Sequence, residues 1–369
     1  MHKIQAENYP IHIDTTVFDQ INEFLNQVEF QDSKFFIFVD ENTNEHCLPS
    51  LIWHIDKLQA AEIIETESGE ENKTLETTYQ LWNVLTELEA DRNSVAINLC
   101  GGMLSDMAGF VSSTFKRGIR FINIPTTLLS MVDASIGGKL GIDMEGLKNQ
   151  IGLFNNPEAI FINTDYLKTL DSRQLKAGMA EIIKHGLIAD ANYLDEIYQS
   201  ANFSTADIII DENIWPQIIS KSLTLKNTIV SQDFHEKGIR KTLNFGHTVG
   251  HAIESWFLKH LPKQALLHGE AVAMGMIAEL YLSHKELNYP KQELEKHISP
   301  ISALFPKRKI PVESFTEILN LMHHDKKNSK GDINFVLISK TGQAKFNTHC
   351  SEEQIIESLN YLNTIIKNI

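Results

Sequence analysis

The sequence has 369 residues, of which 42% are hydrophobic and 22% are charged, and its formal net charge is −15 at pH 7. This length favours two domains, and the composition is that of a globular protein with a substantial core. The acidic balance argues against nucleic acid or an anionic membrane as the main partner, but it leaves a small anionic substrate open.

Three features of the sequence bear on its compartment. The three cysteines, Cys47, Cys100 and Cys350, are widely spaced and form no CxxC pair, which suits a reducing environment. The N-terminal residues lack the apolar segment of a signal peptide. No apolar run approaches the roughly 20 residues that a membrane span needs. We therefore expect a soluble protein of the cytoplasm.

The first part of the chain alternates predicted strands with helical patterns. Short runs of β-branched and aromatic residues predict strands at 34–41, 94–100, 120–125 and 159–163. Between two of them, residues 74–90 predict an amphipathic helix, because leucine and valine side chains recur at roughly the helical period. This alternation indicates a mainly parallel, Rossmann-like sheet, and ligands on such sheets bind beyond the carboxyl ends of the strands.

Helical periodicity dominates beyond about residue 170. Helices are predicted at 172–189, 215–232, 247–261, 269–287 and 352–368. One exception, residues 332–346, predicts a β-hairpin that turns at Thr341-Gly342. We therefore expect an α/β domain over residues 1–168, a mainly α-helical domain over 169–369, and an active site in the cleft between them.

Two histidines in a predicted helix suggest a metal site. The stretch LNFGHTVGHAIE places His247 and His251 four residues apart, so that they share one helical face. His268 precedes the next helix, and Glu181 interrupts an apolar helical stretch. Imidazole and carboxylate ligands around one cation are typical of a catalytic divalent site, usually of zinc. Histidines at this spacing more often lie on a surface or in a core, so spacing alone leaves the assignment open.

Two glycine-rich segments indicate anion-binding loops. Residues 100–110, CGGMLSDMAGF, follow a predicted strand and open a helix whose amides can face a phosphate, although a simple tight turn fits equally well. Residues 125–143, PTTLLSMVDASIGGKLGID, show little helix or strand pattern in their second half, and long polar loops of this kind are usually functional. Basic residues gather near such loops: Arg117, Lys139, Lys148, Lys184, Lys226, Arg240, Lys326 and Lys327. Singly each fits a solvated charge, but together they favour a substrate with phosphate or carboxylate groups.

These segments resemble, in the same order, the motifs of the 3-dehydroquinate synthase family of sugar phosphate cyclases. The resemblance covers nearly the whole chain and rests on SGEENK, GGMLSDMAGFVSSTFKRG, PTTLLSMVDASIGGK, LKNQIG, GMAEIIKHG, EKGIRKTLNFGHTVGHAIE, LLHGEAVAMGM and DKKNSKG. It implies a homodimer that binds NAD on its α/β half, with Zn²⁺, Co²⁺ or another divalent ion at the seam. It also implies conversion of 3-deoxy-D-arabino-heptulosonate 7-phosphate to 3-dehydroquinate and phosphate, in the shikimate pathway of aromatic amino acid biosynthesis.

The resemblance also implies roles for individual residues. The implied metal ligands are Glu181, His247 and His268, which leaves His251 for the substrate phosphate or for proton transfer. The implied NAD contacts are Asp40, Asn42, Glu70, Lys73, Gly102, Asp106, Thr126, Thr127, Lys139 and Lys148. The implied substrate contacts are Arg117, Lys139, Lys148, Asn149, Lys226, Arg240 and Lys326, and Arg117 would reach a phosphate across the dimer interface. The implied catalytic residues are Asp133, Lys139, Lys184, Asn244 and His251. The match does not decide between Lys326 and Lys327.

The implied reaction suits these residue types. Transient oxidation of a substrate hydroxyl by NAD acidifies the neighbouring C–H bond, phosphate leaves, NADH returns its hydride, and an intramolecular aldol addition closes the ring. A divalent ion would polarise the forming ketone, and the cationic side chains would stabilise charge on the departing phosphate.

Three positions depart from the family pattern, namely Asn72, Cys100 and Leu140. We expect Cys100 to crowd the cofactor pyrophosphate and to weaken NAD binding somewhat. Three alternatives stay open: a related sugar phosphate cyclase whose substrate lacks a carboxylate, a metal- and NAD-dependent polyol dehydrogenase that releases NADH, and an NAD-binding module without turnover. Arg240 together with Lys226 favours a substrate that carries a carboxylate.

Overall fold

A computed structural model describes residues 1–144, 147–203, 210–323 and 333–368. The chain divides into two compact units. An α/β unit comprises Met1–Leu170 and Asn213–Asn227, and a helical unit comprises Asp171–Glu212 and Thr228–Ile369. The first unit includes residues 213–227, most of which form the first part of a long helix, Trp215–Gln232. Helical periodicity shows that a helix buries one face, but it does not show which core receives that face.

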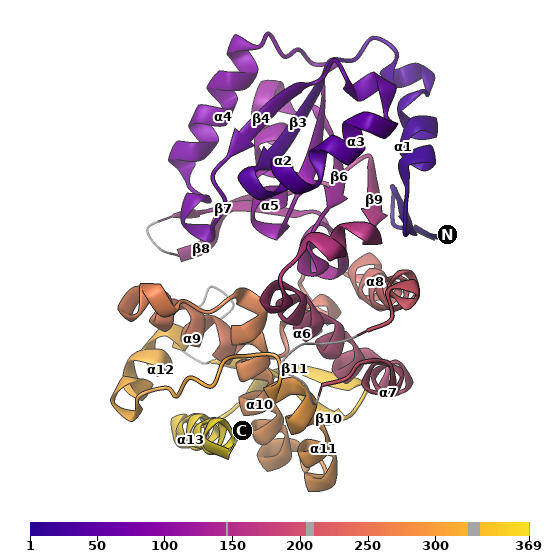
Figure 1. The fold of residues 1–369 in the computed structure, drawn as a ribbon. Coiled ribbons are helices and arrows are strands. Elements are labelled where there is room, and N and C mark those ends of the chain that lie inside the picture. Colours follow the sequence, from indigo (N-terminus) through magenta and orange to yellow (C-terminus); the bar gives the residue numbers. More distant parts are fainter. Residues whose placement is uncertain (145–146, 204–209, 324–332, 369) are drawn as a thin grey trace. The chain divides into compact units, whose positions relative to one another are not determined.

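A seven-stranded sheet forms the centre of the described α/β unit, in the order β1-β2-β9-β6-β5-β3-β4 (Figure 1). Strand β1 pairs antiparallel with β2, and the other neighbouring pairs are parallel, which confirms the mainly parallel sheet. The strands are β1 His2–Gln5, β2 Pro10–Asp14, β3 Phe35–Asp40, β4 Glu62–Thr66, β5 Val95–Cys100, β6 Arg120–Pro125 and β9 Ala159–Asn163. Strands β1, β2 and β4 were not predicted. β1 and β4 are the edge strands and are partly exposed, and β2, next to β1, alternates buried with half-buried residues.

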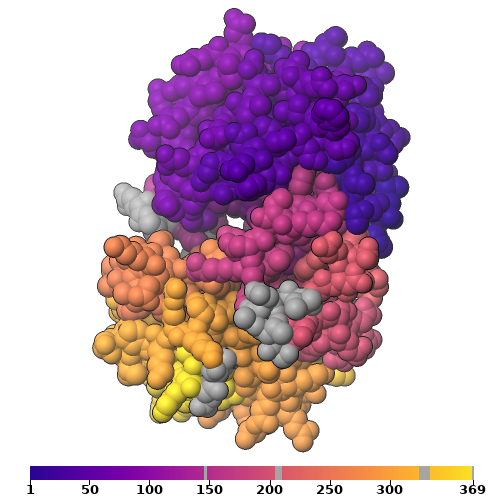
Figure 2. All heavy atoms as spheres, viewed as in Figure 1, coloured from indigo at the N-terminus to yellow at the C-terminus, as the bar shows by residue number. Residues whose placement is uncertain are grey.

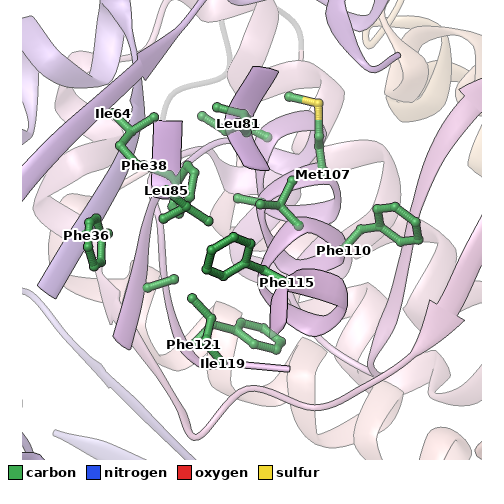
Figure 3. Packing of buried hydrophobic residues seen from close by; sticks show 14 of the residues in the cluster. Phe36, Phe38, Ile64, Leu81, Leu85, Met107, Phe110, Phe115, Ile119 and Phe121 are labelled. Atoms are coloured by element: carbon green, nitrogen blue, oxygen red, sulfur yellow. The ribbon is translucent and has the colours of Figure 1, made fainter. Parts of the chain in front are cut away.

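Helices cover both faces of the sheet, which is why β3, β5 and β9 are buried at every position. On one face, Phe36, Phe38 and Phe121 of the strands pack against Leu81 and Met107 of helices α4 Leu75–Glu87 and α5 Gly102–Thr114 (Figure 3). Helices α1 Phe18–Leu25, α2 Glu41–His46 and α3 Leu48–His54 lie over the other face (Figure 1). The side chains of this layer form a continuous surface in the space-filling view (Figure 2).

Residues 125–143 contain more regular structure than we expected. A π-helical turn spans Ser130–Ala134, and β7 Lys139–Met144 pairs antiparallel with β8 Leu147–Phe154 in a separate two-stranded sheet. Leu140 and Ile142 are buried against α5, and a side chain at Gly109 of α5 would overlap Leu140. The expected loop was therefore wrong for residues 139–143. Facing glycines, Gly141 and Gly152, let the two backbones approach closely and obscure the alternating strand pattern.

The helical unit contains α6 Ser172–Ala189, α7 Ala191–Ser200, α9 His247–His260, α10 His268–Leu287, α11 Lys291–Ser302, α12 Phe315–His323 and α13 Glu352–Asn368, while α8 Trp215–Gln232 is divided between the units. The predicted hairpin is present as β10 Asn334–Lys340 and β11 Gln343–His349. Helix α10 is the centre of this unit, since α6, α9, α11, α13 and β10 all pack against it. Among the described helices, none is both long and apolar enough to cross a membrane.

Candidate functional site

Four potential metal ligands meet inside the helical unit. Glu181 lies on α6, His247 and His251 lie on successive turns of α9, and His268 is the first residue of α10. The Oε1 atom of Glu181 is 3.6 Å from Nε2 of His247 and 3.7 Å from Nε2 of His268. Two ligands of one tetrahedral zinc ion are about 3.4 Å apart, given bonds of about 2.1 Å. The three predicted ligands therefore have nearly the spacing that a shared divalent ion requires.

His251 belongs to the same cluster. Its ring centroid is 5.1 Å from that of His247 and 5.4 Å from that of His268, and ligand atoms of the three imidazoles lie within 4.8 Å of one another. The ring is thus close enough to bind a cation directly or to contact a substrate bound to it. Sequence spacing predicted that His247 and His251 share a face, but it did not predict how near His268 would lie.

Close helix packing brings these ligands together. A side chain at Gly269 would overlap the main chain at Ala177, so only glycine lets the start of α10 lie directly against α6. On the opposite side, Gly275 of α10 lies against the main chain of Gly246 at the start of α9. Interhelical distances depend on the side chains at the contact, and glycine permits the shortest ones.

The charge around His268 favours a cation. Burial disfavours its protonated form, but hydrogen bonds to Glu181 and to Glu254 outweigh burial and raise the pKa of His268 to about 9. Nδ1 of His268 lies 3.5 Å from Oε2 of Glu254, and Lys184, which is buried, forms an ion pair with Glu181. Glu254 was not among the predicted residues, although its place three residues after His251 in the same motif is a signal that it shares that face.

Two further predicted residues lie just before α9. Arg240 and Asn244 belong to the 3₁₀ helix Ile239–Asn244. Arg240 is only 2% exposed, and its Nη1 donates to the carbonyl of Phe234 at 2.5 Å. Asn244 donates to Oε1 of Glu236 at 2.6 Å, a carboxylate that the sequence did not single out. The guanidinium of Arg240 is therefore held in the interior by the main chain and is not a solvated surface charge.

Most of the predicted NAD residues lie at the carboxyl ends of the sheet strands in the α/β unit, whereas Lys139 and Lys148 lie on β7 and β8. Asp40 ends β3 and caps α2, Glu70 and Lys73 follow β4, Gly102 opens α5 after β5, and Thr126 follows β6. Asn42, Asp106 and Thr127 are near them in sequence, on α2, on α5 and after Thr126. Strands β6, β5, β3 and β4 are consecutive neighbours and run parallel. Their carboxyl ends therefore present these residues side by side, where sheets of this type bind dinucleotides.

Lys73 connects several of these residues through hydrogen bonds and ion pairs. It is 2% exposed, and its Nζ donates to Oδ2 of Asp106 and to Oδ1 of Asn149, each at 2.7 Å. Burial disfavours its charged form, but Asp106 and Glu70 outweigh burial and raise its pKa. Lys148 lies 3.5 Å from Glu70, so both cations belong to one charge network. Asn149, predicted as a substrate contact, is thus also tied to Lys73.

Two observations at this edge fit a bound phosphate-containing ligand. Helix α5 begins after Gly101 without a side-chain cap, so the amides of its first turn are available to an anion. The buried Oγ1 of Thr126 has no hydrogen-bond partner among the described residues. Buried hydroxyls are usually paired, so an unpaired one in a predicted binding site is a natural contact for a ligand.

The other predicted residues of this unit are dispersed. Lys226 of α8 donates to Oδ1 of Asp133 at 2.7 Å and to its carbonyl at 2.5 Å, which ties α8 to the π-helical turn. Lys139 is exposed at the start of β7, and Arg117 is exposed with a φ of +72°. Of the predicted residues beyond this unit, Lys326 and its neighbour Lys327 lie outside the described residues.

Cys100 and Leu140, two of the positions that depart from the family pattern, are core residues. Both side chains are buried in the hydrophobic cluster between the sheet and α5. Burial also raises the pKa of the Cys100 thiol well above its usual value, so the group is a neutral core side chain. The structure therefore does not support the expected crowding of the pyrophosphate, nor weaker NAD binding on that account.

Comparison with known proteins places this fold in a class. The chain is similar to 2-deoxy-scyllo-inosose synthase, solved with carbaglucose-6-phosphate, NAD⁺ and Co²⁺, with 24% identity, a TM-score of 0.84, and coverage of 98% of this chain and 100% of that one. It is also similar to 2-epi-5-epi-valiolone synthase from Streptomyces hygroscopicus subsp. jinggangensis 5008, solved with NAD⁺ and Zn²⁺, with 22% identity, a TM-score of 0.82 and 99% coverage of both chains. The chain has the fold of these two synthases.

Sequence relatives identify the family within that class. The profile described as 3-dehydroquinate synthase N-terminal matches residues 63–177, and the profile described as 3-dehydroquinate synthase C-terminal matches residues 178–328. A 3-dehydroquinate synthase of Parabacteroides distasonis is 42% identical over 342 residues, which are 93% of this chain and 94% of that protein. The chain belongs to the 3-dehydroquinate synthase family.

Proposed function

We propose that this protein converts 3-deoxy-D-arabino-heptulosonate 7-phosphate to 3-dehydroquinate and phosphate, using NAD and a divalent metal ion. Family membership supports the reaction. The observation that carries the proposal is the placement of the Glu181 carboxylate within 3.7 Å of Nε2 of both His247 and His268. We further propose that the enzyme works in the cytoplasm as a homodimer, within the shikimate pathway.

Glu181, His247 and His268 would hold the metal ion, and we propose Zn²⁺ as its identity. When bound, NAD accepts and returns a hydride while the metal ion polarises the oxygen atoms of the substrate. Lys184, buried beside Glu181, holds a positive charge at the reacting end. His251 faces the same space and is placed to move a proton at a substrate oxygen or at the phosphate.

We assign binding of the anionic groups of the substrate to side chains whose positions are fixed by hydrogen bonds within the protein. The guanidinium of Arg240 donates to the carbonyl of Phe234, and its backbone N–H donates to Asp233, so the residue is held in place for bidentate binding of a carboxylate or phosphate. Asn244 and Lys226 are each fixed by a carboxylate, that of Glu236 and that of Asp133. Fixed donors stabilise charge as it develops on the departing phosphate without reorganising in that step. We also assign binding of the phosphate or carboxylate groups of the substrate to Lys139, Lys148, Asn149 and Lys326, and to Arg117 of a second subunit.

The NAD site is proposed at the strand ends of the α/β unit. The uncapped start of α5, with Gly102, would receive the pyrophosphate, and Thr126 with Thr127 would contact the cofactor through hydroxyl groups. Asp40 and Asn42 after β3 would contact the ribose or the adenine, and Glu70, Lys73 and Asp106 would shape the floor of the site.

One assay separates the proposed reaction from its alternatives. The purified protein with Zn²⁺, NAD and the seven-carbon keto acid phosphate is expected to release phosphate without net accumulation of NADH. Accumulation of NADH without phosphate would instead indicate a polyol dehydrogenase. Equal turnover of a sugar phosphate that lacks the carboxylate would indicate a related cyclase, and no turnover of either substrate would refute the proposal.

Variants on one helix test the metal ligand. His268→Ala is expected to lose bound Zn²⁺ and activity together. His284→Ala is the matched control, because His284 lies on the same helix and contacts the carbonyl of Tyr289 away from the cluster. A His268→Ala protein that retains both stoichiometric Zn²⁺ and activity would refute the ligand assignment.

A further inference from the structure

A buried carboxylate on α10 holds the start of α9. Glu279 is fully buried, and its Oε2 accepts from the amide of Gly246 at 2.6 Å. Its Oε1 accepts from the amide of Val249 at 3.2 Å. These two amides belong to the residue before α9 and to its first turn, where a helix leaves donors without internal partners.

Helix α9 needs this external cap because it has none of its own. Its N-cap residue is Gly246, which has a φ of +80° and no side chain to accept from the first turn. A side chain at Gly246 would overlap Met276 and the carbonyl of Val272, so a serine or aspartate cap does not fit there. The cap therefore comes from the neighbouring helix, and Gly275 allows that helix to approach.

The capped amide is also linked to the metal cluster. The N–H of Gly246 and the carbonyl of Phe245 belong to one planar peptide unit, so a partner that fixes one of them fixes the other. The Phe245 carbonyl lies 3.1 Å from Nδ1 of His247. Since a carbonyl only accepts, Nδ1 must carry the proton, and the lone pair of the neutral ring is then on Nε2, the atom that lies 3.6 Å from Oε1 of Glu181.

We propose that Glu279 is a positioning residue for the metal site, which orients the Phe245–Gly246 peptide and thereby sets the tautomer and direction of the His247 ring. The inference rests on the proposed metal ion at Glu181, His247 and His268. A carboxylate on the amide also polarises the peptide, so its carbonyl becomes a stronger acceptor for Nδ1–H. A residue that only stabilised the fold would affect unfolding but would not change the tautomer of His247.

Glu279→Gln tests this role with little change in shape. The amide side chain keeps one acceptor, but its NH₂ group would face a backbone N–H, so one of the two caps is lost. We expect the Kd for Zn²⁺, measured by competition with a chromophoric chelator, to rise about 10- to 100-fold. Ser283→Ala is the matched control, because Ser283 is buried one turn along α10, donates to the main-chain carbonyl of Glu279 and accepts from the amide of Ile338 in β10, so its removal leaves the carboxylate of Glu279 in place. This control is expected to lose stability and keep its affinity for Zn²⁺.

A second measurement uses the unchanged protein. Nitrogen-15 NMR of the metal-free protein, at a pH where the ring is neutral, should show His247 as the Nδ1–H tautomer; the Nε2–H tautomer would overturn the inference even if Glu279→Gln does not fold. Unchanged Zn²⁺ affinity in a folded Glu279→Gln variant would also overturn it. Failure of the unchanged protein to bind Zn²⁺ at all would overturn the proposed metal site itself, which keeps the two failures distinct.

Discussion

Gly275→Ala should separate the position of the metal ligands from the stability of the fold. An added Cβ at residue 275 would lie 2.0 Å from the carbonyl oxygen of Gly246 and 2.7 Å from the amide nitrogen of Gly250. Carbon–oxygen contacts normally begin at about 3.3 Å, so α9 and α10 must separate locally by about 1.3 Å. The displaced carbonyl belongs to the peptide that carries the amide of His247. We therefore expect His247 to move relative to His268.

The two effects of this substitution differ in size. Overpacking costs about 1–3 kcal/mol, whereas alanine gains roughly 1 kcal/mol over glycine inside a helix, so the free energy of unfolding should fall by about 2 kcal/mol at most. Metal sites tolerate displacements of only about 0.5 Å. We therefore expect the Kd for Zn²⁺ to rise at least about 10-fold, comparable with loss of a residue that supports a ligand.

The assay is Zn²⁺ competition with a chelator, run beside thermal unfolding of the metal-free protein. Ala278→Gly is the control, because it removes a methyl group from the same buried helix and lowers stability without pushing α9 away. Wild-type Zn²⁺ affinity in a folded Gly275→Ala protein would refute the reasoning, since it would show that the ligand geometry does not depend on this close approach.

Three further predictions concern other buried groups. Lys73→Met leaves the charge of Asp106 without its cation, so the free energy of unfolding of the α/β unit should fall by about 3–5 kcal/mol. The added Asp106→Asn change should restore part of that loss. Denaturant unfolding measures both variants, and an unchanged unfolding midpoint for Lys73→Met would contradict the pairing. Burial lowers the pKa of His297 to about 4, below its ordinary value of 6.5. As the pH falls from 6.5 to about 4, the unfolded chain takes up a proton before the folded protein does. The free energy of unfolding therefore falls, by at most ~1.4 kcal/mol per pH unit. His297→Asn should reduce the change of the urea unfolding midpoint with pH between the folded and unfolded pKa values of His297. An unreduced change of the midpoint with pH would contradict this assignment to His297. Thr126→Val replaces a buried hydroxyl that has no described partner, so stability should hold while the Kd for NAD in calorimetry rises; an unaltered Kd would argue against the assigned contact.

Hydrophobic periodicity was sufficient for the long elements of the fold. Helices α6, α8 and α13 begin and end where their patterns predicted. The order of strands and helices also predicted the parallel sheet. Strands β7 and β8 were missed because their glycines serve a close backbone approach that only the paired structure reveals.

For the candidate site, the sequence determined which residue types were available and which shared a helical face. It placed His247 and His251 on one face of α9, since a helix fixes that relation locally. The family resemblance implied that Glu181 and His268 join His247, but only the tertiary structure showed how closely they approach it, that Glu254 contacts His268, and that Glu279 caps α9. These relations depend on how closely α6, α9 and α10 pack, and such distances arise from side chains and glycines far apart in the chain, which no local pattern encodes.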